Sequence, residues 1–282
     1  DSSNAIRARV RAIPGVAEVD VAQVCCGEDG GTMLYVGIRE EATPPTAHRP
    51  TPTGAARLPA GIVAAGAAFE SALMSAVRRD VAGEDHSRGY SLAHDSAMRA
   101  VQERFIGFAA RRLPLLDSVL RTSADAEHRA LAAQAIAYGA DRKAVAAALL
   151  HAVNDPDDGV RNNAVRALAI LAGWAREHPE AGVVIPSAPF LRLVDSVSWS
   201  DRNKGVFALV ALTATRDSAL LAELRARSLP SLVKMARWTS PGHAMFPFLI
   251  LARIAGMTDQ AASEAWQAGE REAVIARASA QQ

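Results

Sequence analysis

Residues 154–168 read NDPDDGVRNNAVRAL, an acidic turn followed by an amphipathic helix. Pro156 ends the preceding helix, because proline has no amide hydrogen and disfavours the α conformation in the residue before it. Asp157 or Asp158 can cap the next helix by accepting a hydrogen bond from its first turn. The apolar residues of that helix share one face: Val160, Ala164, Leu168 and Leu171.

This stretch resembles a HEAT-type helical repeat, in which the pattern D-x-x-x-x-V-R spans the turn and the start of the second helix of a pair. Here the pattern runs from Asp155 to Arg161. Other helices have predicted aspartate caps: Asp95, Asp125 and Asp141. Basic residues recur at matching places along the chain: Arg99, Arg129, Arg161 and Lys204. The resemblance covers residues 95–215 and extends in weaker form over residues 62–282.

The resemblance implies a mainly α protein, a right-handed α-solenoid of antiparallel helix pairs with an extended surface for a protein or peptide. The composition fits this fold, since half of the residues are apolar but only 5% are aromatic. Small apolar side chains let helices pack closely, and each pair needs a neighbour to cover its apolar stripe. We expect this helical-repeat domain to span residues 61–282, without strands, and to end in a helix over residues 259–278.

The N-terminal segment, residues 1–41, has a different pattern. It predicts a helix over residues 2–12 and two strands, 16–26 and 32–38, joined by a turn that contains Asp29-Gly30. Cys25 and Cys26 are interpreted as small apolar residues on opposite faces of the first strand. A lone hairpin is marginal in water, so it must dock on another surface.

Residues 42–60 are rich in proline, which predicts an extended or disordered linker between the two domains. The chain has a formal net charge of +1, so charge gives no reason to expect a nucleic-acid partner. No apolar run is expected to approach the length of a membrane span. Residue 1 is Asp, which signal-peptide cleavage or truncation would explain; we favour export, with a cytoplasmic location as the alternative.

Motifs that would indicate catalysis are missing from the sequence, including H-E-x-x-H, C-x-x-C and the Walker loop. The acidic turn is not a calcium-binding EF-hand, because Val165 would stand where the loop needs its final carboxylate. We therefore expect no catalytic residues, no metal site and no cofactor.

Two sets of polar residues are candidates for binding. The first set is the polar loop, where charged side chains are densest: Glu84, Asp85, His86, Arg88 and Tyr90. The second set is expected on the outer edge of the central repeat: Arg161, Asn162 and Arg166. The loop residues are interpreted either as a small polar site or as groups that pair with one another and with helix ends.

Three functions remain open. The first is a non-enzymatic interaction or scaffold module with a protein or peptide partner. The second is an enzyme on the same scaffold, since some helical-repeat proteins are alkylpurine DNA glycosylases; the balanced charge argues against it. The third is assembly through the hairpin, whose unpaired edge can accept a strand from another chain. The sequence does not specify an oligomeric state.

Overall fold

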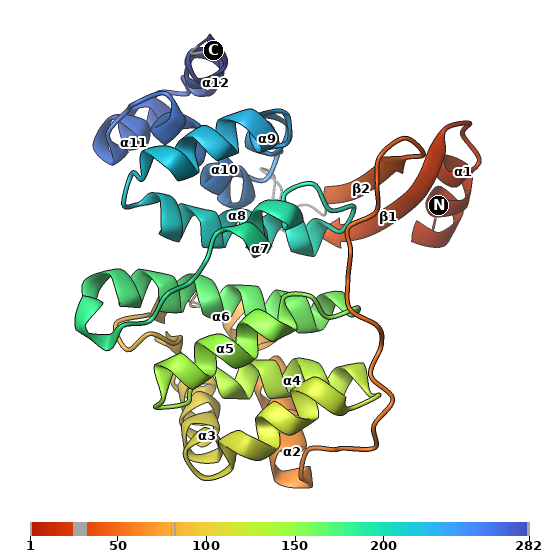
Figure 1. The fold of residues 1–282 in the computed structure, drawn as a ribbon, viewed down its shortest axis with the longest axis vertical. Helices are drawn as coiled ribbons and strands as arrows, with labels where there is room; N and C mark the ends of the chain where they lie inside the picture. The colour runs from red at the N-terminus through yellow and green to blue at the C-terminus, as the bar shows by residue number, and fades with distance from the viewer. Residues whose placement is uncertain (1, 25–32, 80, 82, 281–282) are drawn as a thin grey trace. The chain divides into compact units, whose positions relative to one another are not determined.

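The computed structural model describes residues 2–24, 33–79, 81 and 83–280, and most of the described chain is helical (Figure 1). Contacts group the chain into two compact units. Unit 1 joins Asp1–Thr46 with Ser187–Gln282, and unit 2 is Ala47–Pro186. The boundaries drawn from the sequence remain predictions: 1–41, 42–60 and 61–282.

Unit 2 is built from helices joined by short turns. They are α2 (Ala60–Arg78), α3 (Ser96–Thr122), α4 (Ala126–Ile136), α5 (Arg142–Ala152) and α6 (Asp158–Glu177), followed by the 3-10 turn η1 (Pro179–Ala181). An aspartate accepts backbone hydrogen bonds at the start of the last four helices: Asp95, Asp125, Asp141 and Asp157. The predicted caps are confirmed.

In unit 2, α3 with α4 and α5 with α6 are consecutive helices that pack as antiparallel pairs, as short connections require, and the two pairs meet where α4 packs on α6. α3 packs on α4, α4 on α6 and α5 on α6, and these helices lie side by side in Figure 1. Leu168 and Ala164 of α6 and Ala132 of α4 are fully buried in the seam. The predicted HEAT-like helix pairs with alanine-lined contacts are confirmed.

The proline-rich segment of unit 2, residues 47–59, runs as an extended strap onto the turns between helices. The amide of Gly54 donates to the Thr122 carbonyl, and the Gly54 carbonyl accepts from Ala124, both at 2.8 Å. A Cβ on Gly54 would lie 2.5 Å from the Thr122 oxygen, so only glycine allows this approach. The strap is thus extended, as predicted, and is bound to unit 2.

The expectation of no strand after residue 62 was wrong. Glu84–Asp85 (β3) and Leu92–Ala93 (β4) form an antiparallel ladder within the polar loop. Strands of two residues are too short to show an alternating pattern. The ladder fixes both ends of the loop.

Unit 1 contains the remaining helices. They are α7 (Ala188–Leu193), α8 (Trp199–Thr213), α9 (Ser218–Ala236), α10 (Pro241–Ile254), α11 (Asp259–Gln267) and α12 (Arg271–Ala280). α9 is one continuous helix, which accommodates Pro230. The predicted final helix is divided at Gly269, whose φ of 74° is left-handed and ends α11.

The N-terminal part of unit 1 is the predicted helix and hairpin. α1 (Ser3–Arg11) packs on β1 (Val16–Val24), which pairs antiparallel with β2 (Met33–Glu40) (Figure 1). Cys25, Cys26 and the predicted turn lie outside the described residues. The hairpin docks within unit 1, where Tyr35 contacts Trp238 edge-on at 6.0 Å between ring centroids.

α2 is apolar around much of its circumference. Of the helices in the described residues, α2 is the one that is long and apolar enough to cross a membrane. Its most apolar window has a mean hydropathy of 1.6. By this criterion, the expectation that no apolar run approaches the length of a membrane span was wrong. The helix is rich in alanine, and its two charged residues, Glu70 and Arg78, are too few to lower its mean hydropathy much. Core helices of soluble proteins pass the same test, so this is weak evidence for a membrane.

Candidate functional site

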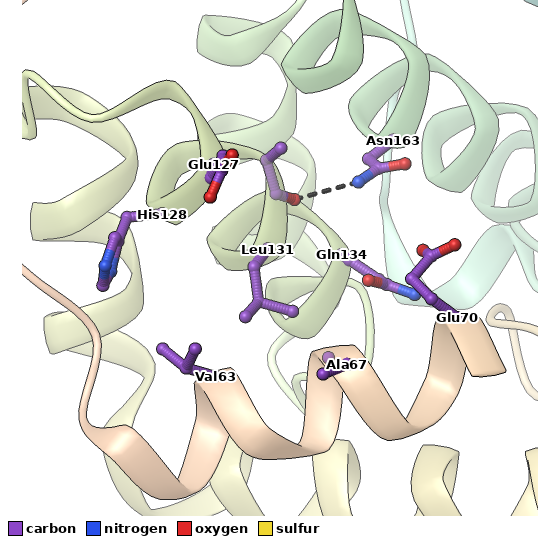
Figure 2. A pocket seen from close by; sticks show the side chains of 10 residues that line it. Val63, Ala67, Glu70, Glu127, His128, Leu131, Gln134 and Asn163 are labelled. Atoms are coloured by element: carbon purple, nitrogen blue, oxygen red, sulfur yellow. Dashed lines mark hydrogen bonds between the residues drawn. The ribbon is translucent and has the colours of Figure 1, made fainter.

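A hollow of about 390 Å³ opens between α2 and α4 (Figure 2). Each helix contributes one face, because residues three, four and seven apart lie above one another. From α2 these residues are Val63, Gly66, Ala67 and Glu70, and from α4 they are Glu127, Ala130, Leu131 and Gln134, with neighbouring His128. Asn163 of α6 completes the lining, and we call this hollow the α2–α4 groove.

The floor of the groove is apolar. Val63 is 41% exposed, and Figure 2 shows its side chain and that of Leu131 on facing helices. A Cβ on Gly66 would lie 2.9 Å from both methyl carbons of Leu131, so glycine permits the helices to approach here. An apolar floor that is open between two helices is suited to an apolar side chain from another molecule.

The rim of the groove is acidic and polar. Glu70 and Glu127 are exposed and carry its carboxylates. The Asn163 amide nitrogen donates to the Ala130 carbonyl at 3.0 Å, and its oxygen accepts from the Asn162 amide at 3.1 Å. Asn162, a predicted binding residue, therefore orients a residue that lines the groove.

His128 is tied to the strap. Its Nδ1 accepts a hydrogen bond from the backbone amide of Leu58 at 2.8 Å, so this nitrogen carries no proton. The strap thereby fixes the orientation of the imidazole at the end of the groove.

Away from the groove, the structure brings the polar loop and the central repeat, which hold the two predicted sets of binding residues, into contact. Arg166 of α6 forms an ion pair with Glu84 of β3 and donates to the Ser91 hydroxyl at 3.1 Å. His86 Nε2 lies 3.4 Å from the same Glu84 carboxylate. Burial opposes ionisation of Glu84, but the hydrogen bond from His86 and the charge of Arg166 outweigh it and lower its pKa.

The rest of the polar loop is satisfied by its own neighbours. Asp85 accepts from the Ser87 amide at 2.9 Å, and this bond lowers its pKa. The Arg88 carbonyl accepts from Arg142 at 2.8 Å, and that guanidinium lies 4.8 Å from the centre of the buried Tyr90 ring. These contacts match the interpretation of internally paired charges, and a binding role for the loop remains a prediction.

Arg161 does not lie on an outer edge, contrary to expectation. Its side chain is buried, and it donates to the carbonyls of Asp155 at 2.7 Å and Pro156 at 3.0 Å. The arginine of the D-x-x-x-x-V-R pattern thus holds the acidic turn closed. The sequence does not show this, because the spacing fixes the position of Arg161 on the helix but not what covers it.

The α2–α4 groove was not predicted from the sequence. The sequence contains one indication of the groove: residues 60–78 carry apolar side chains on two faces of the helix, whereas a helix at the edge of a stack needs only one apolar face. Within the described residues, no three His, Cys, Asp or Glu side chains gather closely enough to hold a metal ion.

A family model described as HEAT repeats matches residues 113–183. No curated protein matches the chain. Solved structures with a similar helical arrangement include computationally designed armadillo repeat proteins for modular peptide recognition, at 18% identity and a TM-score of 0.41, covering 65% of this chain and 92% of theirs. A second designed armadillo repeat protein has 18% identity and a TM-score of 0.42, covering 69% of this chain and 97% of its own.

Proposed function

The chain carries HEAT-type repeats, and from this premise we propose that it is a non-enzymatic protein-interaction module that binds a protein or peptide through the α2–α4 groove. The observation that supports this most directly is the apolar floor, where Val63 and Ala67 are exposed and Leu131 is half-buried. Exposed apolar surface in a hollow costs free energy in water, and a partner's side chain would remove it.

The chemistry of the rim indicates which partner side chains fit. Glu70 and Glu127 border the floor, and none of the lining residues named above is a lysine or an arginine. We expect the partner to insert an aliphatic side chain and to place a basic residue beside it. The amides of Gln134 and Asn163 are within the lining and suit backbone groups of the bound chain.

The test is photo-crosslinking in native extract. A photoreactive amino acid replaces Ala67 in the groove, and the matched control replaces Ala64, an exposed alanine of α2 that does not line the groove. We expect protein adducts at position 67 that are absent at position 64 and are lost in the Leu131→Arg background. Equal adducts at both positions, or none, would contradict the proposal.

A second candidate is binding through the hairpin. Val19 and Val21 of β1 are buried, but Leu34 and Ile38 on the same face of β2 are 44% and 45% exposed. In the described residues this sheet has two strands, so each strand has one edge with no paired strand, which is the kind of edge that a partner's strand can join. Ile38→Lys should remove adducts formed by a photoreactive group at Leu34, and Glu40→Lys should retain them; loss in both or neither would speak against this surface.

A further inference from the structure

α2 carries two separate apolar stripes. Ile62, Ala65, Phe69 and Ala76 form the buried stripe, and α2 packs on α3. The exposed stripe begins at Val63 and continues four, seven, eleven and fourteen residues further along α2. Residues at this spacing share one face of a helix. The exposed stripe consists of Val63 (41% exposed), Ala67, Glu70, Met74 (52%) and Val77 (45%), with Val81 (41%) just beyond the helix.

Two charges are placed symmetrically on this exposed stripe. Glu70 lies one turn before Met74, and Arg78 lies one turn after it. Eight residues of helix separate them by about 12 Å, which is too far for an ion pair within α2. Neither side chain forms an ion pair within the part of the chain that the structure describes.

The stripe is complementary to itself when two copies run antiparallel. A two-fold axis at Met74 places Glu70 of each helix opposite Arg78 of the other, so both charges are neutralised at once. The same arrangement brings Val81 of the partner subunit opposite Ala67 and toward the α2–α4 groove.

We infer that the occupant of the α2–α4 groove is a second copy of this chain, which forms a two-fold dimer through antiparallel α2 helices. This inference rests on the proposed function of the groove as a protein-binding site and names its partner. A contact made mainly by one helix from each copy is small, so the dissociation constant should be roughly micromolar.

The first test is disulfide trapping, in a background with Cys25→Ser and Cys26→Ser. Met74→Cys places a thiol on the two-fold axis, where the Cα atoms of two copies can come within the roughly 4.4–6.8 Å that a disulfide requires. The matched control is Ser75→Cys, which is also exposed but points about 100° away around the helix. We expect a covalent dimer from Met74→Cys under mild oxidation and little from Ser75→Cys.

The second test is charge reversal, measured by sedimentation equilibrium over a concentration series. Glu70→Arg and Arg78→Glu each place like charges opposite one another and should weaken dimerisation at least tenfold. The double variant restores opposite charges and should recover the parent dissociation constant. Circular dichroism confirms that each variant is folded.

Several outcomes would overturn the dimer. These are a monomeric parent at concentrations well above micromolar, equal trapping at positions 74 and 75, or charge reversal without effect. Binding to phosphatidylcholine vesicles that Met74→Asp abolishes would assign the stripe to a lipid surface and also overturn it. If adducts at Ala67 then identify a different protein, the proposed function stands without the dimer; if no protein adduct forms, both fail.

Discussion

Arg129 and Asp155 form a bidentate ion pair inside unit 2: Nε lies 2.9 Å from Oδ2, and Nη2 lies 2.8 Å from Oδ1. The two side chains are 1% and 0% exposed. Arg129 belongs to α4, and Asp155 belongs to the turn between α5 and α6, so the pair connects successive parts of the stack. Arg49 of the strap adds a second guanidinium to the same carboxylate.

Removing one partner of this pair should destabilise the protein strongly. Asp155→Leu leaves Arg129 buried with an uncompensated charge, which costs about 3–5 kcal/mol in the free energy of unfolding. Urea unfolding measures the loss. The double variant Arg129→Met/Asp155→Leu should cost less than the sum of the two single variants, and strict additivity would show that the pair does not couple these elements.

The strap should contribute to stability through Arg49 more than through Arg57. Arg49 is 16% exposed at its side chain and donates to the Leu120 carbonyl at 3.1 Å as well as to Asp155. Arg49→Ala should cost about 1.5–3 kcal/mol of unfolding free energy, because it removes charged hydrogen bonds. Arg57 also forms an ion pair, but its side chain is 60% exposed, so Arg57→Ala should cost less than about 1 kcal/mol. Equal losses in urea unfolding would be inconsistent with a buried anchor at Arg49.

Gly37 should be essential for docking of the hairpin within unit 1. A Cβ at this buried position would lie 1.9 Å from the Val197 carbonyl oxygen, so Gly37→Ala must displace β2. We expect a lower melting temperature and a changed fluorescence of Trp238, which contacts Tyr35. The control is Gly173→Ala in α6, where no atom lies within 4 Å of the added carbon; alanine there should raise stability by about 0.5–1 kcal/mol. An unaltered Trp238 signal in Gly37→Ala would argue against this docking.

Acid should weaken unit 1 through Asp259. Its hydrogen bonds from Arg253, at 3.1 and 2.9 Å, outweigh partial burial and lower the pKa of the carboxyl group. In the unfolded chain, the pKa of an aspartate is about 3.9, and in the folded protein the pKa of Asp259 is lower. The ionised carboxylate therefore stabilises the fold above about pH 3.9, and this stabilisation is lost as the pH falls through the pKa of the folded state.

The measurement for Asp259 is the unfolding free energy of the parent and of Asp259→Asn at pH 7 and near pH 3. The variant should be less stable than the parent at pH 7, and the two should converge in acid. A difference that stays constant with pH would show that ionisation of Asp259 does not contribute.

Sequence reasoning was accurate where structure depends on neighbours along the chain. Asp125 and Asp141 cap their helices as predicted, because a cap acts over three residues. α3 is interrupted two residues before Pro114, where Arg112 has a non-helical φ of −140°. Tertiary packing buries Ser228, and α9 stays continuous across Pro230 although proline disfavours a helix interior.

The candidate site was predicted only in part. Arg166 and Glu84 were both chosen from the sequence, yet nothing in the sequence indicated that they pair across 82 positions. The α2–α4 groove was missed altogether, since apolar residues of a helix, such as Val63 and Leu131, have the same spacing whether another helix covers them or not.

The sequence by itself determined the helix pairs, their caps, the hairpin and the HEAT-type turn, because these depend on backbone hydrogen bonds and apolar spacing over a few residues. Only the tertiary structure decided which apolar face of α2 is buried, that the strap binds the turns, and that Arg161 is enclosed. Burial depends on which distant surfaces meet, and an apolar side chain has the same local signature whether a neighbouring helix covers it or water does.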